Sequence, residues 1–444
     1  MRQGKQQSFL FLQGPCGPFF RKLGKALSQR GHSVLRINFN GGDVLQWPGG
    51  LTRNFPGLPQ DWPDYVRSLQ EEHGFTDLCL FGDSKPYHHK AISILKEYGV
   101  RVHVFEEGYF RPYWITLERE GVNANSRLPR DPEFYHRQTS RIQRRSPSLH
   151  VGKAPRHFFR YYLNYFLATL CLSGLFPQYK RNSVSPATLR LYPTSSEAIG
   201  DSLRWGFRLL SSKWRNDQAE HQVEKLGSQG ASYFLAPLQL SIDTQITCHS
   251  PFSSMPEYLT YVIQNFAHHA PPDTTLVLKN HPLDPGVRAN RMVAELEAFR
   301  QGVMDRVVFI DGGNLPRILK HCCGVVLINS TTGLSALHHG VPCITLGKAL
   351  YDMNGLTHQG SLESFWKEPT FPDNDLYLAF RKVIMHETQV NGSFYTPKGL
   401  RLAVQASLER LEAAPVTRSF PVSATEVPYP GREEVYQQSS SYFN

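Results

Sequence analysis

Short apolar runs alternate with segments of helical periodicity in the N-terminal part of the chain. The apolar runs, which we expect to form strands, are residues 8–12, 34–39, 78–81 and 102–105. Helical spacing follows the first run over 19–30 and ends at Gly31, a typical C-cap residue. Because strand and helix alternate at this spacing, the pattern predicts a parallel sheet covered by helices on both faces.

The same alternation returns in the C-terminal half. Expected strands lie at 233–237, 275–279, 307–310, 324–328 and 343–346, and expected helices at 255–268, 290–300, 315–321 and 332–339. The sequence therefore predicts an α/β protein of two Rossmann-like domains that face a cleft, where ligands of such sheets bind.

The domain boundaries follow from these two regions and from the amino-acid composition of the segments between and after them. We place an N-terminal domain at 1–180, a helical connector at 181–230 and a second Rossmann-like domain at 231–395. Residues 396–444 are expected to form a helix and a mobile tail rich in proline, serine and polar residues.

A basic stretch and an aromatic run lie between the two alternating regions. The cationic residues are Arg127, Arg130, Arg137, Arg141, Arg144, Arg145, Lys153, Arg156 and Arg160. The run at 158–176 has about the length of a marginal membrane span, but it contains Arg160 and Asn164. We therefore expect a helix that lies in a membrane interface or packs between the domains.

Charge and cysteine usage narrow the classes of partner. The net charge of +10 favours anionic partners such as nucleotide phosphates or acidic lipid headgroups. No helix-turn-helix, zinc-finger or RNP pattern accompanies this charge, so nucleic acid is not an expected partner. The seven cysteines lack metal-binding spacing, which predicts buried thiols and no metal. The apolar run at 8–12 is shorter than a signal-peptide core, and we expect a cytoplasmic protein.

Two adjacent glutamates follow the expected strand at 102–105. Side chains of neighbouring residues at a strand end diverge, so either Glu106 or Glu107 can face a ligand while Arg111 or the backbone holds the other. A carboxylate in that place can act as a general base or acid. The alternative is a solvated pair of loop glutamates.

Two further segments contain candidate phosphate ligands. Lys279, His281 and Pro282 follow an expected strand, where a lysine and a histidine can bind a phosphate, although a simple turn histidine is the alternative. The run Asn329, Ser330, Thr331 and Thr332 joins the expected strand at 324–328 to a helix. These side chains form either an anion site at the helix start or an ordinary N-cap.

Other polar residues at strand ends are weaker candidates. Gln239 can contact a donor and Asp243 can face a reacting carbon, or Asp243 is a turn aspartate. Asp43 is a candidate carboxylate on the acceptor side. The glycines at 14 and 17 do not form a dinucleotide-binding fingerprint.

Six segments, taken in order, make the chain similar to the capsule polysaccharide biosynthesis family and, within it, to the bacterial β-Kdo transferases. They are FLQGPCGPFF, INFNGGD, EEGYFRPYWITLE, APLQLSID, KNHPLD and INSTTGLSALHHGVPCITLG. The resemblance runs from Phe9 to Leu350.

This resemblance implies a GT-B glycosyltransferase without metal or other cofactor, with CMP-β-Kdo as its donor substrate. It assigns catalysis to Glu106 and Glu107 and binding of CMP to His281, Pro282 and the run 330–332. Transfer with retained configuration requires a carboxylate nucleophile, and our hypothesis gives that role to Asp243.

The resemblance also implies an acceptor and a location. The acceptor would be an anionic glycerophospholipid, (lyso)phosphatidylglycerol, at the inner face of the inner membrane, with other capsule assembly enzymes as partners. Because the chain has one catalytic unit, it would add a single sugar. The alternatives are a non-catalytic capsule export or assembly protein and a transferase for another CMP-sugar such as sialic acid.

Overall fold

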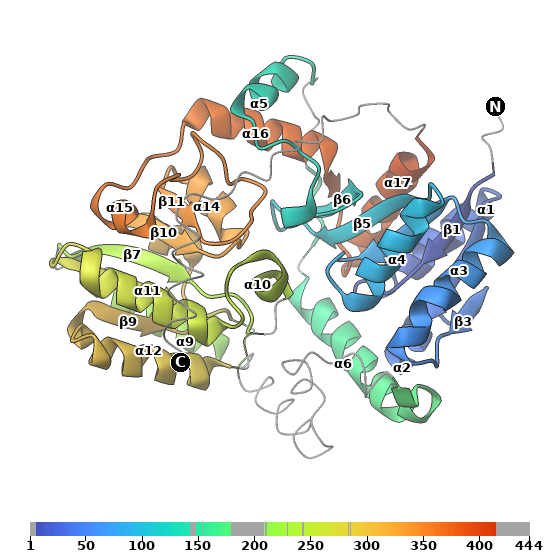
Figure 1. The fold of residues 1–444 in the computed structure, drawn as a ribbon, viewed down its shortest axis with the longest axis horizontal. Helices are drawn as coiled ribbons and strands as arrows, with labels where there is room; N and C mark the ends of the chain where they lie inside the picture. The colour runs from blue at the N-terminus through green and yellow to red at the C-terminus, as the bar shows by residue number, and fades with distance from the viewer. Residues whose placement is uncertain are drawn as a thin grey trace. The chain divides into compact units, whose positions relative to one another are not determined.

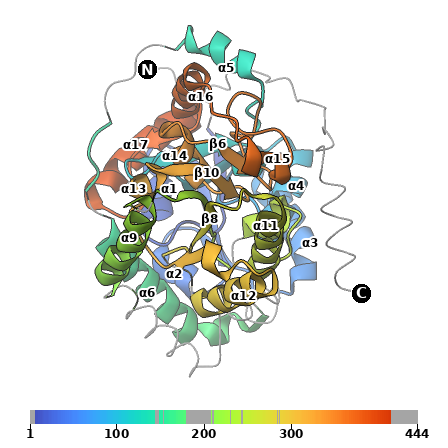
Figure 2. The ribbon, with the colours of Figure 1, turned by 90° about the vertical axis from the view of Figure 1, so that its left-hand side faces the viewer.

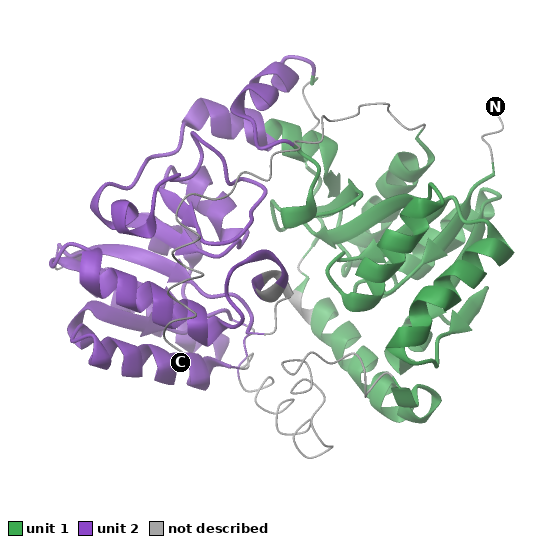
Figure 3. Ribbon diagram, in the orientation of Figure 1, with its two compact units in different colours: residues 1–128, 142–192, 382–422 green, residues 129–141, 193–381, 423–444 purple. Residues whose placement is uncertain are grey.

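The computed structural model describes residues 6–142, 148–152, 154–178, 208, 211–228, 230–241, 244–282, 284 and 286–413. The chain divides into two compact units, coloured separately in Figure 3. Unit 1 comprises 1–128, 142–192 and 382–422, and unit 2 comprises 129–141, 193–381 and 423–444.

Unit 1 contains a seven-stranded sheet in the order β12-β6-β5-β4-β1-β2-β3. The strands are β1 (Ser8–Phe11), β2 (Ser33–Asn38), β3 (Thr52–Asn54), β4 (Asp77–Phe81), β5 (Arg101–Glu107), β6 (Trp114–Arg119) and β12 (Gln389–Asn391). Strands β1 to β5 are parallel, as predicted. The prediction of a wholly parallel sheet was wrong at one edge, where β6 runs antiparallel to β5 and to β12. The connection from β5 to β6 is too short for a crossover, so only antiparallel pairing is available.

Helices cover both faces of this sheet (Figure 1). They are α1 (Phe19–Gln29), α2 (Gly41–Gln46), α3 (Trp62–His73), α4 (Pro86–Glu97) and α17 (Pro397–Glu412). Helix α6 (Pro155–Cys171) packs against α2. Alternate residues of β1 enter two different cores: Leu10 packs with residues of α3 and α4, and Phe9 with residues of α1 and α17. This two-residue period is the expected one for a strand that is buried on both faces.

Unit 2 contains a five-stranded parallel sheet in the order β11-β10-β7-β8-β9. The strands are β7 (Ser232–Pro237), β8 (Thr274–Lys279), β9 (Val307–Ile310), β10 (Cys322–Leu327) and β11 (Cys343–Thr345), which confirms the five predicted runs. The helices are α5 (Pro132–Thr139), α9 (Ser212–Ser228), α10 (Thr244–His249), α11 (Met255–His269), α12 (Val287–Arg300), α13 (Leu315–Leu319), α14 (Thr332–His338) and α15 (Leu362–Lys367). Figure 2 shows α11 and α12 on one side of the sheet and α9 with α13 on the other.

The units and the predicted domains divide the chain differently at the C-terminal end. Helix α16 (Asn374–Glu387) passes from unit 2 into unit 1, and β12 then pairs with β6. The second domain was expected to end at 395, whereas the corresponding segment of unit 2 ends at 381. The connector expected at 181–230 is described only at Arg208, in α9 and at residues 211 and 230. The predicted tail lies outside the described residues after Ala413.

The aromatic run forms α6, as expected for a helix. Among the described residues, no helix has the length and apolar character that crossing a membrane requires.

The cysteines are all unpaired, but the prediction of buried thiols was wrong for Cys171 and Cys248, which are exposed. Cys171 ends α6 and Cys248 lies in the short helix α10, so neither belongs to a strand facing a core.

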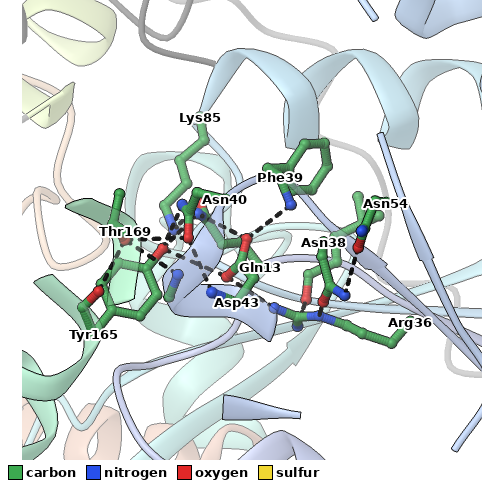
Figure 4. Close-up of polar contacts among 12 residues, drawn as sticks. Gln13, Arg36, Asn38, Phe39, Asn40, Asp43, Asn54, Lys85, Tyr165 and Thr169 are labelled. Atoms are coloured by element: carbon green, nitrogen blue, oxygen red, sulfur yellow. Dashed lines mark hydrogen bonds and ion pairs between the residues drawn. The ribbon is translucent and has the colours of Figure 1, made fainter. Parts of the chain in front are cut away.

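A buried ion pair joins β2 to the start of α2 (Figure 4). Arg36 Nη2 lies 3.0 Å from Asp43 Oδ1, and the two side chains are 2% and 1% exposed. Asp43 also accepts a hydrogen bond from the backbone N–H of Phe39 at 3.0 Å. Arg36 Nη1 in turn donates to the carbonyl of Leu12, after β1. The hypothesis that Asp43 serves an acceptor was wrong, because its oxygens are used inside the fold.

The first prediction concerns this pair. Replacing Asp43 with Ala leaves the Arg36 guanidinium buried without a counter-ion, so the free energy of unfolding should fall by about 3–5 kcal/mol. Urea unfolding of the full chain measures it. Asp64→Ala removes the exposed i,i+3 pair with Arg67 and should change stability by less than about 1 kcal/mol. Equal losses in the two variants would contradict the structural role of Asp43.

Candidate active site

Parallel strands place the residues that follow them at one edge of a sheet, and in unit 2 this edge gathers most of the predicted ligands. Gln239 follows β7, Lys279 ends β8, and Asn329 and Ser330 follow β10. Since β7 lies between β8 and β10 in the sheet, these positions are neighbours. The backbone N–H of Asn329 donates to Gln239 Oε1 at 3.4 Å, which brings two of the predicted residues into contact.

Lys279 has an unusual environment for a lysine. Its side chain is buried, with 8% of the residue exposed, and among the described residues its ammonium has no hydrogen-bond acceptor and no carboxylate within 4.0 Å. Burial lowers the pKa of Lys279, an effect that the charge of Asp311 opposes and that of Arg215 reinforces. A buried ammonium of this kind is stabilised by an anionic ligand.

Two arginines that no sequence motif indicated pair with Asp311, whose charge acts on this lysine. Arg208 donates from both terminal nitrogens to the two oxygens of Asp311, at 3.0 and 2.8 Å, and Arg215 lies 3.2 Å from Asp311 Oδ2. These contacts lower the pKa of Asp311 against the effect of its burial. Arg208 Nη2 also donates a hydrogen bond to the carbonyl of Pro282 at 3.3 Å. This bond helps to fix the backbone of the predicted phosphate-binding segment.

The segment around His281 and Pro282 is fixed by its neighbours. Asn280, which is fully buried, donates to the carbonyl of His281 at 3.1 Å and to Asp311 at 3.1 Å. His281 is half-buried and Pro282 is exposed, so the imidazole lies at the surface of the unit.

Asp284 joins two of the motifs quoted for the family resemblance. It accepts hydrogen bonds from the backbone and hydroxyl of Ser241, each at 3.1 Å, and from Asn290 at 2.8 Å. Burial raises the pKa of Asp284, while the bonds from Ser241 lower it. The loop after β7, which contains Gln239, is thereby tied to the loop after β8. Asp243 lies outside the described residues, so its predicted role stays a prediction.

The hydroxyl run before α14 is not an ordinary N-cap. Thr331 occupies the cap position without a side-chain bond to the helix. Ser330 Oγ accepts from the backbone N–H of Thr332 at 3.2 Å and lies 3.1 Å from Thr332 Oγ1. A Cβ at Gly333 would lie 2.3 Å from the hydroxyl of Tyr351, so only glycine fits there. The proposed phosphate role of these hydroxyls stays a prediction.

In unit 1 the two predicted glutamates end β5. Glu106 accepts a hydrogen bond from the backbone N–H of Glu107 at 3.0 Å, which confirms that the backbone holds one of the pair. The hydroxyl of Tyr395 donates to Glu107 Oε1. A Cβ at Gly108 would lie 2.1 Å from the carbonyl of Trp114, the first residue of β6. Because β6 passes so close to this position, the motif requires a glycine here.

Two of the described carboxyl groups, Glu106 and Glu118, have a pKa raised to about 7. Glu106 is the one that belongs to the predicted motif at the end of β5. Burial raises its pKa to about 7, and the negative charge of Glu107 adds to the effect. The bond from the Glu107 backbone and the positive charges of Lys85 and Arg111 oppose it. General acid–base catalysis is most efficient when the pKa lies near the working pH.

Tyr395 could not have been recognised from the sequence. It lies 288 positions after Glu107 and reaches it only because the chain returns to unit 1 through β12. Burial and the neighbouring Glu107 raise the pKa of Tyr395 well above its usual value, so it remains a hydrogen-bond donor.

The second prediction tests the ionisation of Glu106 through stability. The folded chain keeps its proton up to about pH 7, whereas the unfolded chain releases it near pH 4.5. Stability is therefore lost as the pH rises between these values, by up to about 1.4 kcal/mol per pH unit. Glu106→Gln abolishes this loss, so its stability relative to wild type should be greater at about pH 8 than at about pH 5.

Unfolding in urea at both pH values measures this difference. Glu97→Gln, at an exposed position of α4, is the matched control and should change stability by less than about 0.5 kcal/mol at either pH. A difference between Glu106→Gln and wild type that is the same at both pH values would contradict the assignment.

Comparison with known proteins agrees with the motifs. A family described as capsule polysaccharide biosynthesis protein matches residues 76–395. The capsule polysaccharide modification protein LipB of Neisseria meningitidis serogroup A is 35% identical over 399 residues, covering 88% of this chain and 92% of LipB. The capsule polysaccharide export protein KpsS of Escherichia coli is 33% identical over 401 residues, covering 88% of this chain and 97% of KpsS.

Among solved structures, the β-Kdo 2,7 transferase of Thermosulfurimonas dismutans KpsC aligns with a TM-score of 0.41 and 13% identity. That alignment covers 91% of this chain and 100% of the other. The family match and the two relatives confirm the resemblance to the capsule polysaccharide biosynthesis family that the six segments indicated. The chain belongs to the capsule polysaccharide biosynthesis protein family.

Proposed function

We propose that the protein is a glycosyltransferase that adds a single β-Kdo from CMP-β-Kdo to (lyso)phosphatidylglycerol. This reaction would initiate the lipid-linked Kdo linker of capsular polysaccharide at the inner face of the inner membrane. The observation that supports it most is Lys279, a buried ammonium without an anionic partner among the described residues, at the ligand-binding edge of a parallel sheet. The donor is a substrate, and the proposal includes no cofactor.

The donor site of the proposal is in unit 2. Lys279 would bind the phosphate of CMP, with His281 and the hydroxyls of Ser330 and Thr332 as further donors. Charge-assisted bonds to the phosphate become stronger as negative charge develops on the leaving CMP, which favours the transition state over the ground state. Gln239 would contact the donor from the loop that Asp284 fixes.

The acid–base groups of the proposal are in unit 1. In a retaining route the Asp243 carboxylate attacks the anomeric carbon as CMP departs with the bonding electrons. The acceptor hydroxyl then attacks that carbon, gives its proton to Glu106 or Glu107, and displaces the carboxylate. Glu106, with a pKa of about 7, is half ionised at neutral pH and fits the role of proton acceptor. Tyr395 would hold Glu107 in one orientation.

The main alternative is a non-catalytic role in capsule export, which the name of the E. coli relative suggests for that protein. A second alternative is transfer of another CMP-sugar, such as sialic acid. Binding of CMP separates the first alternative from the proposal, and the mass of the product separates the second.

The third prediction concerns the donor. Lys279→Gln removes the only ammonium that we assign to the CMP phosphate, so CMP should bind about 10- to 100-fold more weakly, the equivalent of about 1.5–3 kcal/mol. Isothermal titration calorimetry of the full chain measures the affinity. Lys320→Gln, at the end of α13 on an exposed position, is the control and should bind CMP as wild type does. Unchanged affinity in Lys279→Gln would remove the donor site from this edge.

The fourth prediction concerns transfer itself. With CMP-Kdo generated in situ and a fluorescent phosphatidylglycerol analogue, mass spectrometry should detect a product heavier by one Kdo. Glu106→Gln and Glu107→Gln should each lower the rate of transfer. Substitution of the glutamate that accepts the proton should lower this rate by about 10²- to 10⁴-fold. His281→Ala should weaken donor use. Glu97→Gln should retain the wild-type rate.

The outcomes of this assay discriminate among the candidate functions. Products with several added sugars would contradict single addition. CMP binding without product would exclude this sugar or this acceptor. Absence of both would favour the export role over catalysis.

A further inference from the structure

Helix α6 has one face that is built into unit 1. Its Tyr165 hydroxyl accepts hydrogen bonds from Asn40 at 2.7 Å and from Gln13 at 2.9 Å (Figure 4). A Cβ at Gly41 would lie 2.3 Å from the carbonyl of Ala168, so α2 and α6 approach more closely than any side chain would allow. This close packing fixes the position of α6 on unit 1.

The other face of α6 exposes a stripe of apolar side chains. Phe159, Leu163 and Leu167 recur every four residues and are 36%, 37% and 48% exposed, and Tyr162 beside them is 38% exposed. Residues at this spacing form one continuous surface on a helix. A contiguous exposed apolar surface of this kind marks a site of interaction more often than isolated exposed residues do.

A chain of aromatic contacts connects this stripe to the candidate acid–base groups. The ring of Tyr162 stacks on that of Phe158 with centroids 6.0 Å apart, and Phe158 meets Tyr395 edge-on at 5.1 Å. The Tyr395 hydroxyl donates to Glu107. These aromatic side chains therefore join the exposed stripe to the carboxylate at the end of β5.

A cation is linked to α6 by hydrogen bonds, because Lys85 donates to Gln13 and Gln13 donates to the hydroxyl of Tyr165. Among the residues that the structure describes, Lys85 Nζ has Gln13 Oε1, at 3.4 Å, as its hydrogen-bond acceptor and no carboxylate within 4.0 Å. Its charge nevertheless acts on both Glu106 and Cys16. Burial lowers the pKa of Lys85, and the negative charges of Asp43 and Glu106 oppose this effect.

We propose that unit 1 binds an anionic lipid with its phosphate at Lys85 and its acyl chain along Phe158 and Tyr162 onto the stripe of Leu163 and Leu167. The proposal rests on the proposed function, because it locates the acceptor of that reaction. The ammonium, which Gln13 links to α6, and the apolar side chains of α6 match the two parts of such a lipid. A hydroxyl of the headgroup would then lie next to Glu106 and Glu107.

The first experiment compares two acceptors that share a headgroup. Leu163→Gln combined with Leu167→Gln should raise the KM for long-chain lysophosphatidylglycerol about 10-fold or more, since both leucines would lose their apolar contact with the acyl chain. The KM for a short-chain, water-soluble phosphatidylglycerol should stay within about twofold of wild type. Leu51→Gln, which alters a leucine of unit 1 before β3 that is 57% exposed, should change neither value. Equal effects on the two acceptors, or no effect, would overturn the acyl site.

The second experiment measures binding without turnover. Fluorescence anisotropy should show that Lys85→Gln weakens binding of a fluorescent lysophosphatidylglycerol about 10-fold while leaving an uncharged monoacylglycerol unchanged. If the affinities for lysophosphatidylglycerol and monoacylglycerol change as expected but no sugar is transferred, the lipid site is supported and the proposed reaction is contradicted. If transfer occurs and neither variant affects lipid binding, the reaction stands and the site falls.

A membrane contact is the remaining occupant of the stripe. Sedimentation with phosphatidylglycerol vesicles tests it in the same double variant. Loss of vesicle binding together with unchanged affinity for the monomeric lipid would show that the stripe contacts the bilayer surface and would overturn the acyl site.

Discussion

The arrangement of unit 1 depends on the buried contact between Arg36 and Asp43. One guanidinium binds the Asp43 carboxylate and the carbonyl of Leu12, and the same carboxylate accepts from the backbone of Phe39. The segment that leaves β1 and the segment that leaves β2 are thereby fixed to one another at the same edge of the sheet. Such a pair is expensive to desolvate, and it is tolerated because the remaining lone pairs and protons find partners in the surrounding network.

The network around this pair extends to the groups that we assign to chemistry. Gln13 links Asp43 and Tyr165 to Lys85, and Lys85 acts on Glu106. A substitution at Asp43 would therefore remove a hydrogen-bond partner of Gln13, the residue that also accepts from Lys85.

Unit 2 shows the difference between a satisfied and an unsatisfied buried charge. Asp311 is paired with two arginines, so it needs no ligand. Lys279, on the neighbouring strand, is buried without such a partner among the described residues. The first arrangement is complete in the folded chain, whereas the second gains stability when an anion binds. This contrast, more than the presence of a lysine in a motif, supports a phosphate ligand.

The sequence predicts what depends on local pattern and fails where contacts are distant. Four strands of the unit 1 sheet and all five strands of the unit 2 sheet followed from short apolar runs. Glu106, Glu107 and Lys279 were identified from their places at strand ends. Antiparallel β6 was not predicted because its residues lie within the segment EEGYFRPYWITLE, which was interpreted only as a functional motif. Tyr395 and Arg208 were missed because nothing near them in the chain marks a partner so far away. Asp43 was misjudged since exposure cannot be read from a glycine-rich loop.

The most direct test of the account is the pH dependence of transfer. If Glu106 exchanges the proton, the rate under single-turnover conditions should depend on a group with a pKa of about 7. Lys85→Met removes a positive charge and should raise that pKa, whereas Glu107→Gln removes a negative charge and should lower it. Opposite displacements in the two variants would support Glu106 as the ionising group. A profile that neither variant displaces would contradict the account, because the ionisation would then belong to a group elsewhere.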